Sequence, residues 1–480
     1  MSITLKGDKV IIAVPTIKQK ALRINLNENI YGSFAEIGAG QETVRNFFRA
    51  GGASGTIAKA MSAYDKVFSD EIYGVEENKR YVTEKRLKKM LAYEVNLLEE
   101  RLSRTQHPDK IFFTFANTVT TIDFAKKFKG HGWLGIRYQV DPIEDFNEII
   151  IHIRFKENDA RHQQETLGML WTNLIHGAYY QHDKPEDLLL SLYDNIGKDK
   201  IEVDMINFSG PRFKHIDNRL MSLYLVKYGM TDAVMFGPDG NNLLPAQELY
   251  KKNILSFRGS FRPITKVVMD IYEKSKELFL QDPQVNPDKV QVLFEMTMNN
   301  LRTSNNNNEI DERDFLDRAE LLGSLGMHVM ITNLQEYYKY VEYLSEFTKK
   351  RMGLGMGIYN LIQVFEDKYY THLSGGTLEA IGKLFHKNVK FYLYPLKNRQ
   401  TKKLTTTNNI SVHSSIHDLF NYYKQSGYFV DIEDFDIETI EILSRTVFKM
   451  ILTKQEGWEK LIPNGVACII KEKELFGYKK

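Results

Sequence analysis

The sequence predicts an α/β protein with two domains. At roughly 150 residues per domain, a chain of 480 residues is long enough for more than one domain. Apolar, β-branched runs alternate with helical patterns along most of the chain, which is typical of βαβ units and a largely parallel sheet. The chain is 42% apolar and 12% aromatic, so it has enough apolar side chains to form hydrophobic cores.

Short apolar runs predict the strands, and amphipathic stretches between them predict the helices. The predicted strands in the first half are Lys9–Val14, Ile111–Phe115, Leu134–Val140, Glu148–Phe155, Ile201–Phe208 and Asp232–Phe236. Those in the second half are Asn253–Phe257, Lys289–Met298, His328–Thr332, Leu354–Tyr359 and Lys390–Tyr394. The predicted helices are Thr83–Leu102, Asp159–Tyr179, Thr265–Leu280 and Asp311–Leu325. The polar segment between Leu134–Val140 and Glu148–Phe155 indicates an antiparallel hairpin.

A domain boundary is expected near residue 250, shortly after the turn sequence Gly237–Gly240. This divides the chain into an N-terminal α/β domain of unknown role, residues 1–250, and a second domain, residues 251–480. Two polar tracts in the second domain, Thr303–Asn308 and Lys397–Asn409, are predicted to be surface loops.

Composition excludes several classes of protein. With 64 Lys and Arg against 62 Asp and Glu, the chain lacks the basic excess of a dedicated nucleic-acid binder. One cysteine, Cys468, excludes a disulfide framework and a cysteine-rich zinc site, and we expect no metal bound by side chains alone. We expect neither a signal peptide nor a membrane-spanning helix, because residues 1–20 hold only a short apolar run and no apolar stretch reaches membrane-spanning length. We therefore expect a cytoplasmic protein without a membrane partner, and a homo-oligomer is left open.

The segment Asn253–Leu280 combines a strand, a glycine-containing turn and an amphipathic helix. Such a junction directs backbone N–H groups and a helix N-terminus at one point, which suits a phosphate. The same geometry also fits an ordinary strand-to-helix turn. The residue types are therefore needed to distinguish a phosphate site from such a turn.

The sequence G-S-F-R-P-I-T at Gly259–Thr265 resembles the first signature of the nucleotidyltransferases that transfer an adenylyl group from ATP to a phosphate. The family includes nicotinate-mononucleotide and phosphopantetheine adenylyltransferases. Leu443–Lys449 (LSRTVFK) resembles the later family motif I-S-S-T-x-I-R, and Leu461–Phe476 resembles the segment that closes the bacterial nicotinate-nucleotide enzymes. The resemblance covers about residues 253–480 and implies a Rossmann-like domain with a parallel sheet.

The resemblance also implies a reaction and its residues. The reaction is transfer of AMP from ATP, with Mg²⁺, to nicotinate or nicotinamide mononucleotide in NAD synthesis, so the expected partners are small nucleotides. Thr265 and Lys266 take the catalytic positions. The positions that contact ATP are Gly259, Ser260, Phe261, Arg262, Ser444, Thr446 and Lys449.

The chain departs from the family pattern where the chemistry is most demanding. Val267 and Val268 replace the Gly and the catalytic His, and a valine side chain cannot donate a hydrogen bond to phosphate. Loss of such a donor is expected to cost on the order of a hundredfold in rate. Lys449 replaces an Arg and loses its planar fork. Two interpretations stay open: an adenylyltransferase with altered phosphate handling, or a catalytically inactive nucleotide-binding or scaffold protein that keeps the fold.

Polar residues near the ends of two predicted strands are further pocket candidates. Glu295, Thr297 and Asn299 alternate at the end of one strand, and Gly355 and Gly357 lie at the end of another. Carboxyl ends of parallel strands are where α/β proteins bind ligands, so we assign these five residues to a substrate pocket. A solvated strand edge explains the first three equally well.

Three motifs in the first half stay weak. Gly38–Gly40 and Gly51–Thr56 are glycine-rich and precede helical sequence, but neither carries the Lys-Ser/Thr of a P-loop. His152 and Arg154 lie on the polar face of a strand, where solvent exposure is the simpler expectation. His162 and Glu165 have metal-ligand spacing, yet two residues do not make a site.

Overall fold

The computed structural model describes residues 3–5, 10–102, 104–302, 309–398 and 400–479. The predicted loop Thr303–Asn308 lies outside the described residues. The chain forms two compact units, Met1–Thr231 and Asp232–Lys480. The division comes before residue 250 because the strand that begins at Ala233 pairs with strands of the second unit. Both units are α/β, as predicted.

The N-terminal unit contains a six-stranded mixed sheet in the order β4-β3-β5-β6-β7-β8. Its strands are β3 (Ile30–Gly38), β4 (Ile57–Ser62), β5 (Ile111–Thr120), β6 (His131–Tyr138), β7 (Asn147–Phe155) and β8 (Ile201–Ser209), and β1 (Ile3–Leu5) pairs separately with β2 (Val10–Ile12). Strands β4, β3 and β5 are parallel, and β5 to β8 are antiparallel. The β6–β7 pair confirms the predicted hairpin.

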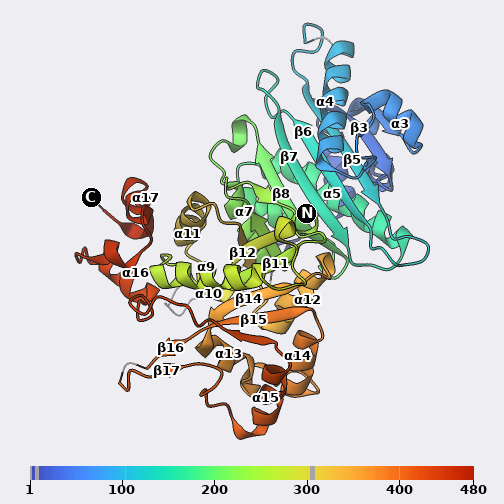
Figure 1. The fold of residues 1–480 in the computed structure, drawn as a ribbon. Coiled ribbons are helices and arrows are strands. Elements are labelled where there is room, and N and C mark those ends of the chain that lie inside the picture. The colour runs from blue at the N-terminus through green and yellow to red at the C-terminus, as the bar shows by residue number, and fades with distance from the viewer. Residues whose placement is uncertain (1–2, 6–9, 103, 303–308, 399, 480) are drawn as a thin grey trace. The chain divides into compact units, whose positions relative to one another are not determined.

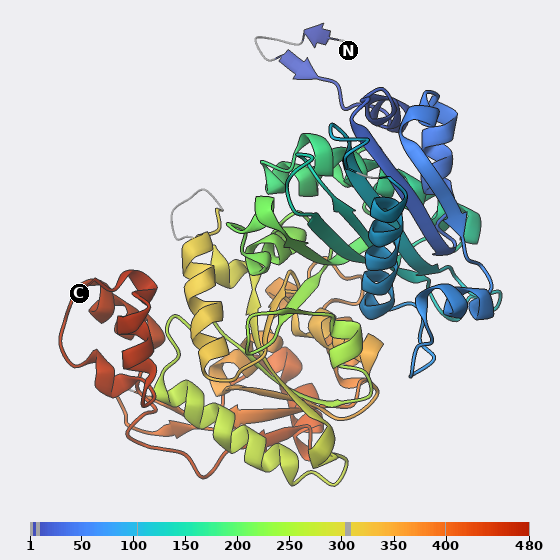
Figure 2. The same ribbon diagram turned by 90° about the horizontal axis from the view of Figure 1, so that it is seen from above.

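Helices cover both faces of this sheet. They are α1 (Ile17–Asn25), α2 (Glu42–Ala50), α3 (Lys66–Tyr73), α4 (Glu84–Arg101), α5 (Ala160–Tyr180), α6 (Pro185–Ser191) and α7 (Asn218–Lys227). Helix α4 lies across β5 and β6, as Figure 2 shows from above. On the opposite face α5 packs its Trp171 ring against Phe115, with ring centroids 4.8 Å apart.

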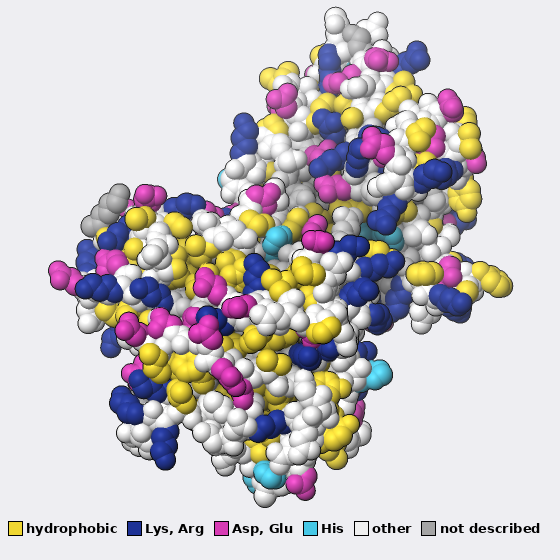
Figure 3. Space-filling model, viewed as in Figure 1, with side chains coloured by type: hydrophobic (Ala, Val, Ile, Leu, Met, Phe, Trp, Pro, Cys, Tyr) yellow, Lys and Arg dark blue, Asp and Glu magenta, His cyan; other side chains and the backbone are white. Residues whose placement is uncertain are grey.

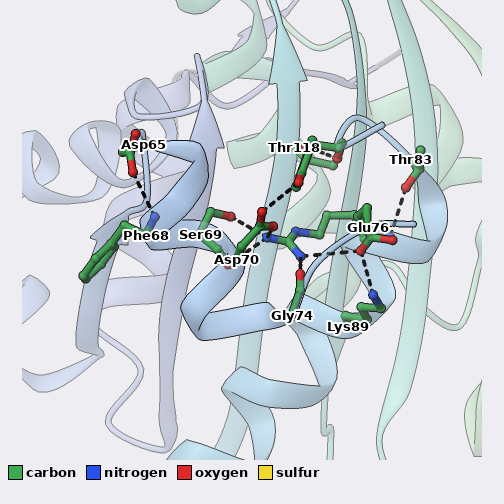
Figure 4. A network of polar contacts seen from close by, with 11 residues as sticks. Asp65, Phe68, Ser69, Asp70, Gly74, Glu76, Thr83, Lys89 and Thr118 are labelled. Carbon is green, nitrogen blue, oxygen red and sulfur yellow. Dashed lines mark hydrogen bonds and ion pairs between the residues drawn. The ribbon is translucent and has the colours of Figure 1, made fainter. Parts of the chain in front are cut away.

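A fully buried arginine joins α3 to α4. Arg86 donates hydrogen bonds to the backbone oxygens of Ser69 and Gly74, and it is 3.5 Å from Asp70 and from Glu76 (Figure 4). A buried guanidinium is tolerated only where its donors find partners of this kind. The network therefore fixes the segment between α3 and α4.

The second unit has an eight-stranded sheet in the order β10-β9-β13-β12-β11-β14-β15-β18. Its strands are β9 (Ala233–Phe236), β10 (Asn242–Leu243), β11 (Asn253–Arg258), β12 (Val290–Thr297), β13 (Val329–Thr332), β14 (Met352–Gly357), β15 (Val389–Tyr394) and β18 (Phe429–Asp431), with β16 (Leu396–Lys397) and β17 (Leu404–Thr405) as a separate small hairpin. The six strands from β13 to β18 in this order are parallel, and β9 and β10 add an antiparallel edge.

The order β13-β12-β11-β14-β15-β18 is the 3-2-1-4-5-6 order of a doubly wound Rossmann-like sheet. The helices are α8 (Pro245–Glu248), α9 (Lys266–Leu280), α10 (Met298–Leu301), α11 (Glu312–Ser324), α12 (Tyr337–Phe347), α13 (Ile358–Val364), α14 (Gly376–Phe385), α15 (His417–Gln425), α16 (Ser444–Leu452) and α17 (Val466–Glu472). In Figure 1, α9 lies above β14 and β15, and α13, α14 and α15 lie below these two strands. The chain thus winds to opposite faces on either side of the β11–β14 pair.

The surface matches the near-neutral composition. On the face shown in Figure 3, side chains of both charge signs are exposed across the surface. No helix among the described residues is both long and apolar enough to cross a membrane.

Candidate functional site in the C-terminal unit

A cavity of about 330 Å³ opens at the carboxyl ends of the central parallel strands. Its lining comes from the ends of β11 and β12, the segment after β13, and α13 with the turn that follows it. The lining residues are Arg258, Gly259, Thr297, Asn299, Asn300, Gln335, Glu336, Tyr337, Asn360, Gln363, Val364, Tyr369 and Tyr370. Because β11 and β14 are neighbours whose connections leave to opposite faces, this is the topological switch point, where open α/β sheets bind ligands.

A buried ion pair supports the base of the cavity. Arg258 holds the carboxylate of Glu295 with two of its nitrogens, one of them at 2.8 Å, and Thr332 donates a further hydrogen bond to that carboxylate at 2.6 Å. Glu295 is fully buried. Burial opposes the charge on Arg258, but the attraction of Glu295 outweighs it and raises the pKa of the guanidinium. The ion pair joins β11 to β12.

Arg258 also positions the rim. Its remaining donors reach the backbone oxygens of Leu334, at 2.8 Å, and Gln335, at 2.5 Å. Its guanidinium lies over the ring of Tyr337, 4.4 Å from the centroid. Arg258 therefore stabilises the cavity wall, and its positive charge is balanced by the carboxylate of Glu295.

The rest of the lining is rich in amides and tyrosines. Five of the side chains are Asn or Gln, and each supplies both hydrogen-bond donors and acceptors. Burial raises the pKa of Tyr337 and of Tyr370, so both phenols are neutral at physiological pH. Such a surface suits a ligand with a flat ring and mixed donors and acceptors.

The structure places three of the predicted site residues in the cavity lining: Gly259, Thr297 and Asn299. Thr297 also forms a capping box with Asn300, its hydroxyl donating at 2.7 Å, and this turns the chain from β12 into α10. Glu295 lies beneath the lining, bound to Arg258. Gly355 lies inside β14, where an added Cβ would be 2.2 Å from the ring of Phe257, so it is a packing residue.

Gly357 begins the turn from β14 into α13, and a Cβ there would meet open space. It is consistent with an open strand end, although it does not line the cavity.

The loop Gly259–Thr265 is held from outside the cavity. Arg318 of α11 donates to the Ser260 oxygen at 3.1 Å, and Arg262 forms an ion pair with Asp314. The Arg262 guanidinium lies 3.9 Å from the ring centroid of Phe448. Arg262 therefore already has an anionic partner and an aromatic one, and it is not an unpaired cation for phosphate.

The start of α9 keeps one feature of a phosphate site. Thr265 is its N-cap residue and is fully buried, yet its hydroxyl has no hydrogen-bond partner among the described residues. Lys266 follows as the first helical residue and is half-buried. Phe261 is buried with its ring 5.3 Å from that of Phe294, so its role is packing.

The late motif contacts the loop of the first signature. Ser444 begins α16 and donates a hydrogen bond of 2.8 Å to the Pro263 oxygen. Thr446 and Lys449, further along α16, are exposed. Thus Ser444 fixes the loop, and the other two face solvent.

Most cavity residues that sequence reasoning missed come from segments after β13 and β14, and Arg258 and Asn300 come from β11 and α10. Gln335 precedes α12 and Tyr337 begins it, Asn360 and Gln363 lie in α13, and Tyr369 and Tyr370 follow α13. Their only signal is their position after predicted strand ends, which many polar residues share.

The weaker motifs of the N-terminal unit have structural placements. Gly38–Gly40 turns β3 into α2, and Gly51–Thr56 leads from α2 into β4. His152 is buried, with only 2% of its surface exposed, which corrects the expectation that it faces solvent. Glu165 pairs with Arg161 at 3.0 Å instead of with His162. Among the described residues no cluster of three or more His, Cys, Asp or Glu has a metal-binding arrangement.

Comparisons with known proteins do not identify a family for this chain. No protein-family model matches the chain, and no curated protein matches it significantly. The chain is similar to a competence/damage-inducible protein from Agrobacterium tumefaciens, at 14% identity and a TM-score of 0.26, over 34% of this chain and 97% of that one. A CinA-superfamily protein from Escherichia coli matches at 14% identity and a TM-score of 0.24, over 40% and 95%. Scores of this size establish no shared function.

Proposed function

We propose that the C-terminal unit binds a nucleotide in the switch-point cavity. The observation that carries the proposal is the position of the cavity, at the reversal of a 3-2-1-4-5-6 parallel sheet. This is the place where doubly wound sheets bind nucleotides. The 330 Å³ volume falls at the lower end of ordinary ligand sites.

The lining chemistry supports a nucleoside within the cavity. Asn299, Asn360 and Gln363 offer donors and acceptors that match the edge of a base or the hydroxyls of a ribose. Tyr337 and Tyr369 offer aromatic surface for a base. The start of α9, where Lys266 is half-buried and a helix N-terminus favours negative charge, is the place proposed for the phosphates. ATP with Mg²⁺ is the first ligand to test.

Adenylyl transfer to nicotinate or nicotinamide mononucleotide is the second candidate. The hydrogen bond from Ser444 to Pro263 favours it, because this bond brings together the two segments that resemble the transferase signatures. Two features oppose it: Val268 replaces the catalytic His, and Arg262 is paired with Asp314. We therefore propose nucleotide binding without efficient transfer as the function of this unit.

Isothermal titration of the full chain with ATP and Mg²⁺ tests binding. Asn299→Ala and Asn360→Ala are each expected to weaken binding about fivefold, since one hydrogen bond contributes about 1 kcal/mol. Gln455→Ala, which changes an exposed amide on the same unit, is the matched control and should bind as the original chain does. Failure of ATP, AMP and nicotinamide mononucleotide to bind would refute the proposal.

A product assay separates the two candidates. The protein is incubated with ATP, Mg²⁺ and either mononucleotide, and the dinucleotide is measured by chromatography. We expect nucleotide binding with no dinucleotide above the uncatalysed background. Turnover that is abolished by Thr265→Ala would establish the transferase instead.

A further inference from the structure

Three titratable side chains form a hydrogen-bonded chain in the N-terminal unit. They come from neighbouring antiparallel strands: His131 begins β6, His152 lies in β7 and Asp204 lies in β8. Asp204 Oδ1 is 2.6 Å from His152 Nδ1, and His152 Nε2 is 3.1 Å from His131 Nδ1. We propose that His131, oriented by His152 and Asp204, is the general base of a second site that hydrolyses an activated acyl group carried by a small anion.

The carboxylate determines which nitrogens carry protons. An ionised Asp204 only accepts hydrogen bonds, so His152 Nδ1 must donate to it. In neutral His152, Nε2 is then an acceptor, and His131 Nδ1 must donate to it. This leaves the Nε2 lone pair of neutral His131 unused by the chain of hydrogen bonds. A carboxylate that fixes an imidazole in one tautomer is the arrangement that supports acyl chemistry.

Burial decreases along the chain toward His131. Asp204 is 6% exposed and His152 is 2% exposed, whereas His131 is partly exposed at the end of its strand. Burial, helped by the nearby His152, lowers the pKa of His131 to about 4, although Asp204 acts in the opposite direction. His131 is therefore neutral at pH 7. The Trp133 ring, 4.9 Å from that of His152, covers the inner imidazole.

The connection that leads into His131 is basic and exposed. Lys126, Lys127 and Lys129 lie on the surface just before it. Asp123 holds this turn by accepting from the Lys127 and Phe128 backbone N–H groups, at 2.7 and 2.9 Å. These lysines precede His131 by two to five residues in the chain, and their charge favours an anionic substrate.

The proposed step is the attack of a water molecule on an acyl carbon. His131 Nε2 takes a proton from the water as its oxygen bonds to the carbon, and the bond from that carbon to the leaving oxygen breaks. His131 then returns the proton to the leaving group or to bulk water. While His131 is protonated, His152 and the Asp204 carboxylate share and neutralise the positive charge.

Acetyl phosphate is the probe, since it carries an activated acyl group on an anion and gives acetate and phosphate. His131→Ala is expected to lower kcat/KM at least tenfold. His162→Ala, which removes an exposed histidine from the same unit, is the matched control and should leave the rate unchanged. Replacing Lys126, Lys127 and Lys129 by Gln should raise KM for acetyl phosphate severalfold while hydrolysis of neutral p-nitrophenyl acetate stays the same.

The positioning role of Asp204 needs a readout other than rate. Long-range ¹H–¹⁵N spectra of labelled imidazoles should show His131 protonated at Nδ1 alone, and Asp204→Asn should populate the other tautomer while the backbone spectrum stays folded. Equal acetyl phosphate hydrolysis by the original chain and by His131→Ala would overturn the proposal. So would a spectrum with His131 protonated at Nε2.

Discussion

Removing the carboxylate of Glu295 is the sharpest test of how the cavity is built. Glu295 is fully buried and accepts from Arg258 and Thr332, so Glu295→Leu leaves a buried guanidinium without its counter-charge. Breaking a buried pair by removing one partner costs about 3–5 kcal/mol. At a urea m-value of about 2–3 kcal/mol/M, this predicts a fall of about 1–2 M in the unfolding midpoint of the C-terminal unit.

Urea denaturation gives the free energy, and hydrogen exchange of peptides from β11 and β12 assigns the loss to this unit. Glu273→Gln, which changes an exposed carboxylate on α9, is the control and should stay within about 0.5 kcal/mol. The double variant Arg258→Met with Glu295→Leu should recover much of the loss, because it buries no unpaired charge. A loss below about 1 kcal/mol in Glu295→Leu would refute the role given to this pair.

Three further predictions concern the N-terminal unit. Burial raises the pKa of Glu36 to about 8, so the folded state prefers the protonated acid. The free energy of unfolding should therefore fall as pH rises from about 4.5 to 8, by at most about 5 kcal/mol. Urea titrations at several pH values should show this fall, and Glu36→Gln should remove it. Arg86→Leu should destabilise the unit by about 3–5 kcal/mol, and a variant that melts at the original temperature would contradict the role of the network in Figure 4. Gly40→Ala should cost about 1–3 kcal/mol in thermal unfolding because its Cβ would lie 2.1 Å from the Asn117 amide, whereas Gly55→Ala meets nothing within 4 Å and should be neutral.

Local patterns predicted the elements that carry strong periodicity. Each predicted strand corresponds to a strand of the structure, and α4, α5, α9 and α11 match the four predicted helices to within a few residues. These segments succeed because one face of each is apolar at the right spacing, which is a property of the chain alone.

Two strands of the six-stranded N-terminal sheet were missed because their patterns are weak. Strand β3 (Ile30–Gly38) contains Gly32, Ser33 and Glu36, whose polarity hides a fully paired central strand. Strand β4 (Ile57–Ser62) is an edge strand without a strongly apolar face. Its side chains alternate between half-buried and exposed, and none is fully buried. Both are specified by the neighbours with which they pair.

The sequence by itself determined the α/β class, the chain order of most elements and the strand ends where polar residues gather. The tertiary structure decided which of those residues share a site. Arg262 meets Asp314, Glu295 meets Arg258, and His152 meets Asp204 across 52 positions of the chain. A charged side chain becomes a ligand contact or a structural partner according to which opposite charge folding brings beside it, and that pairing is long-range.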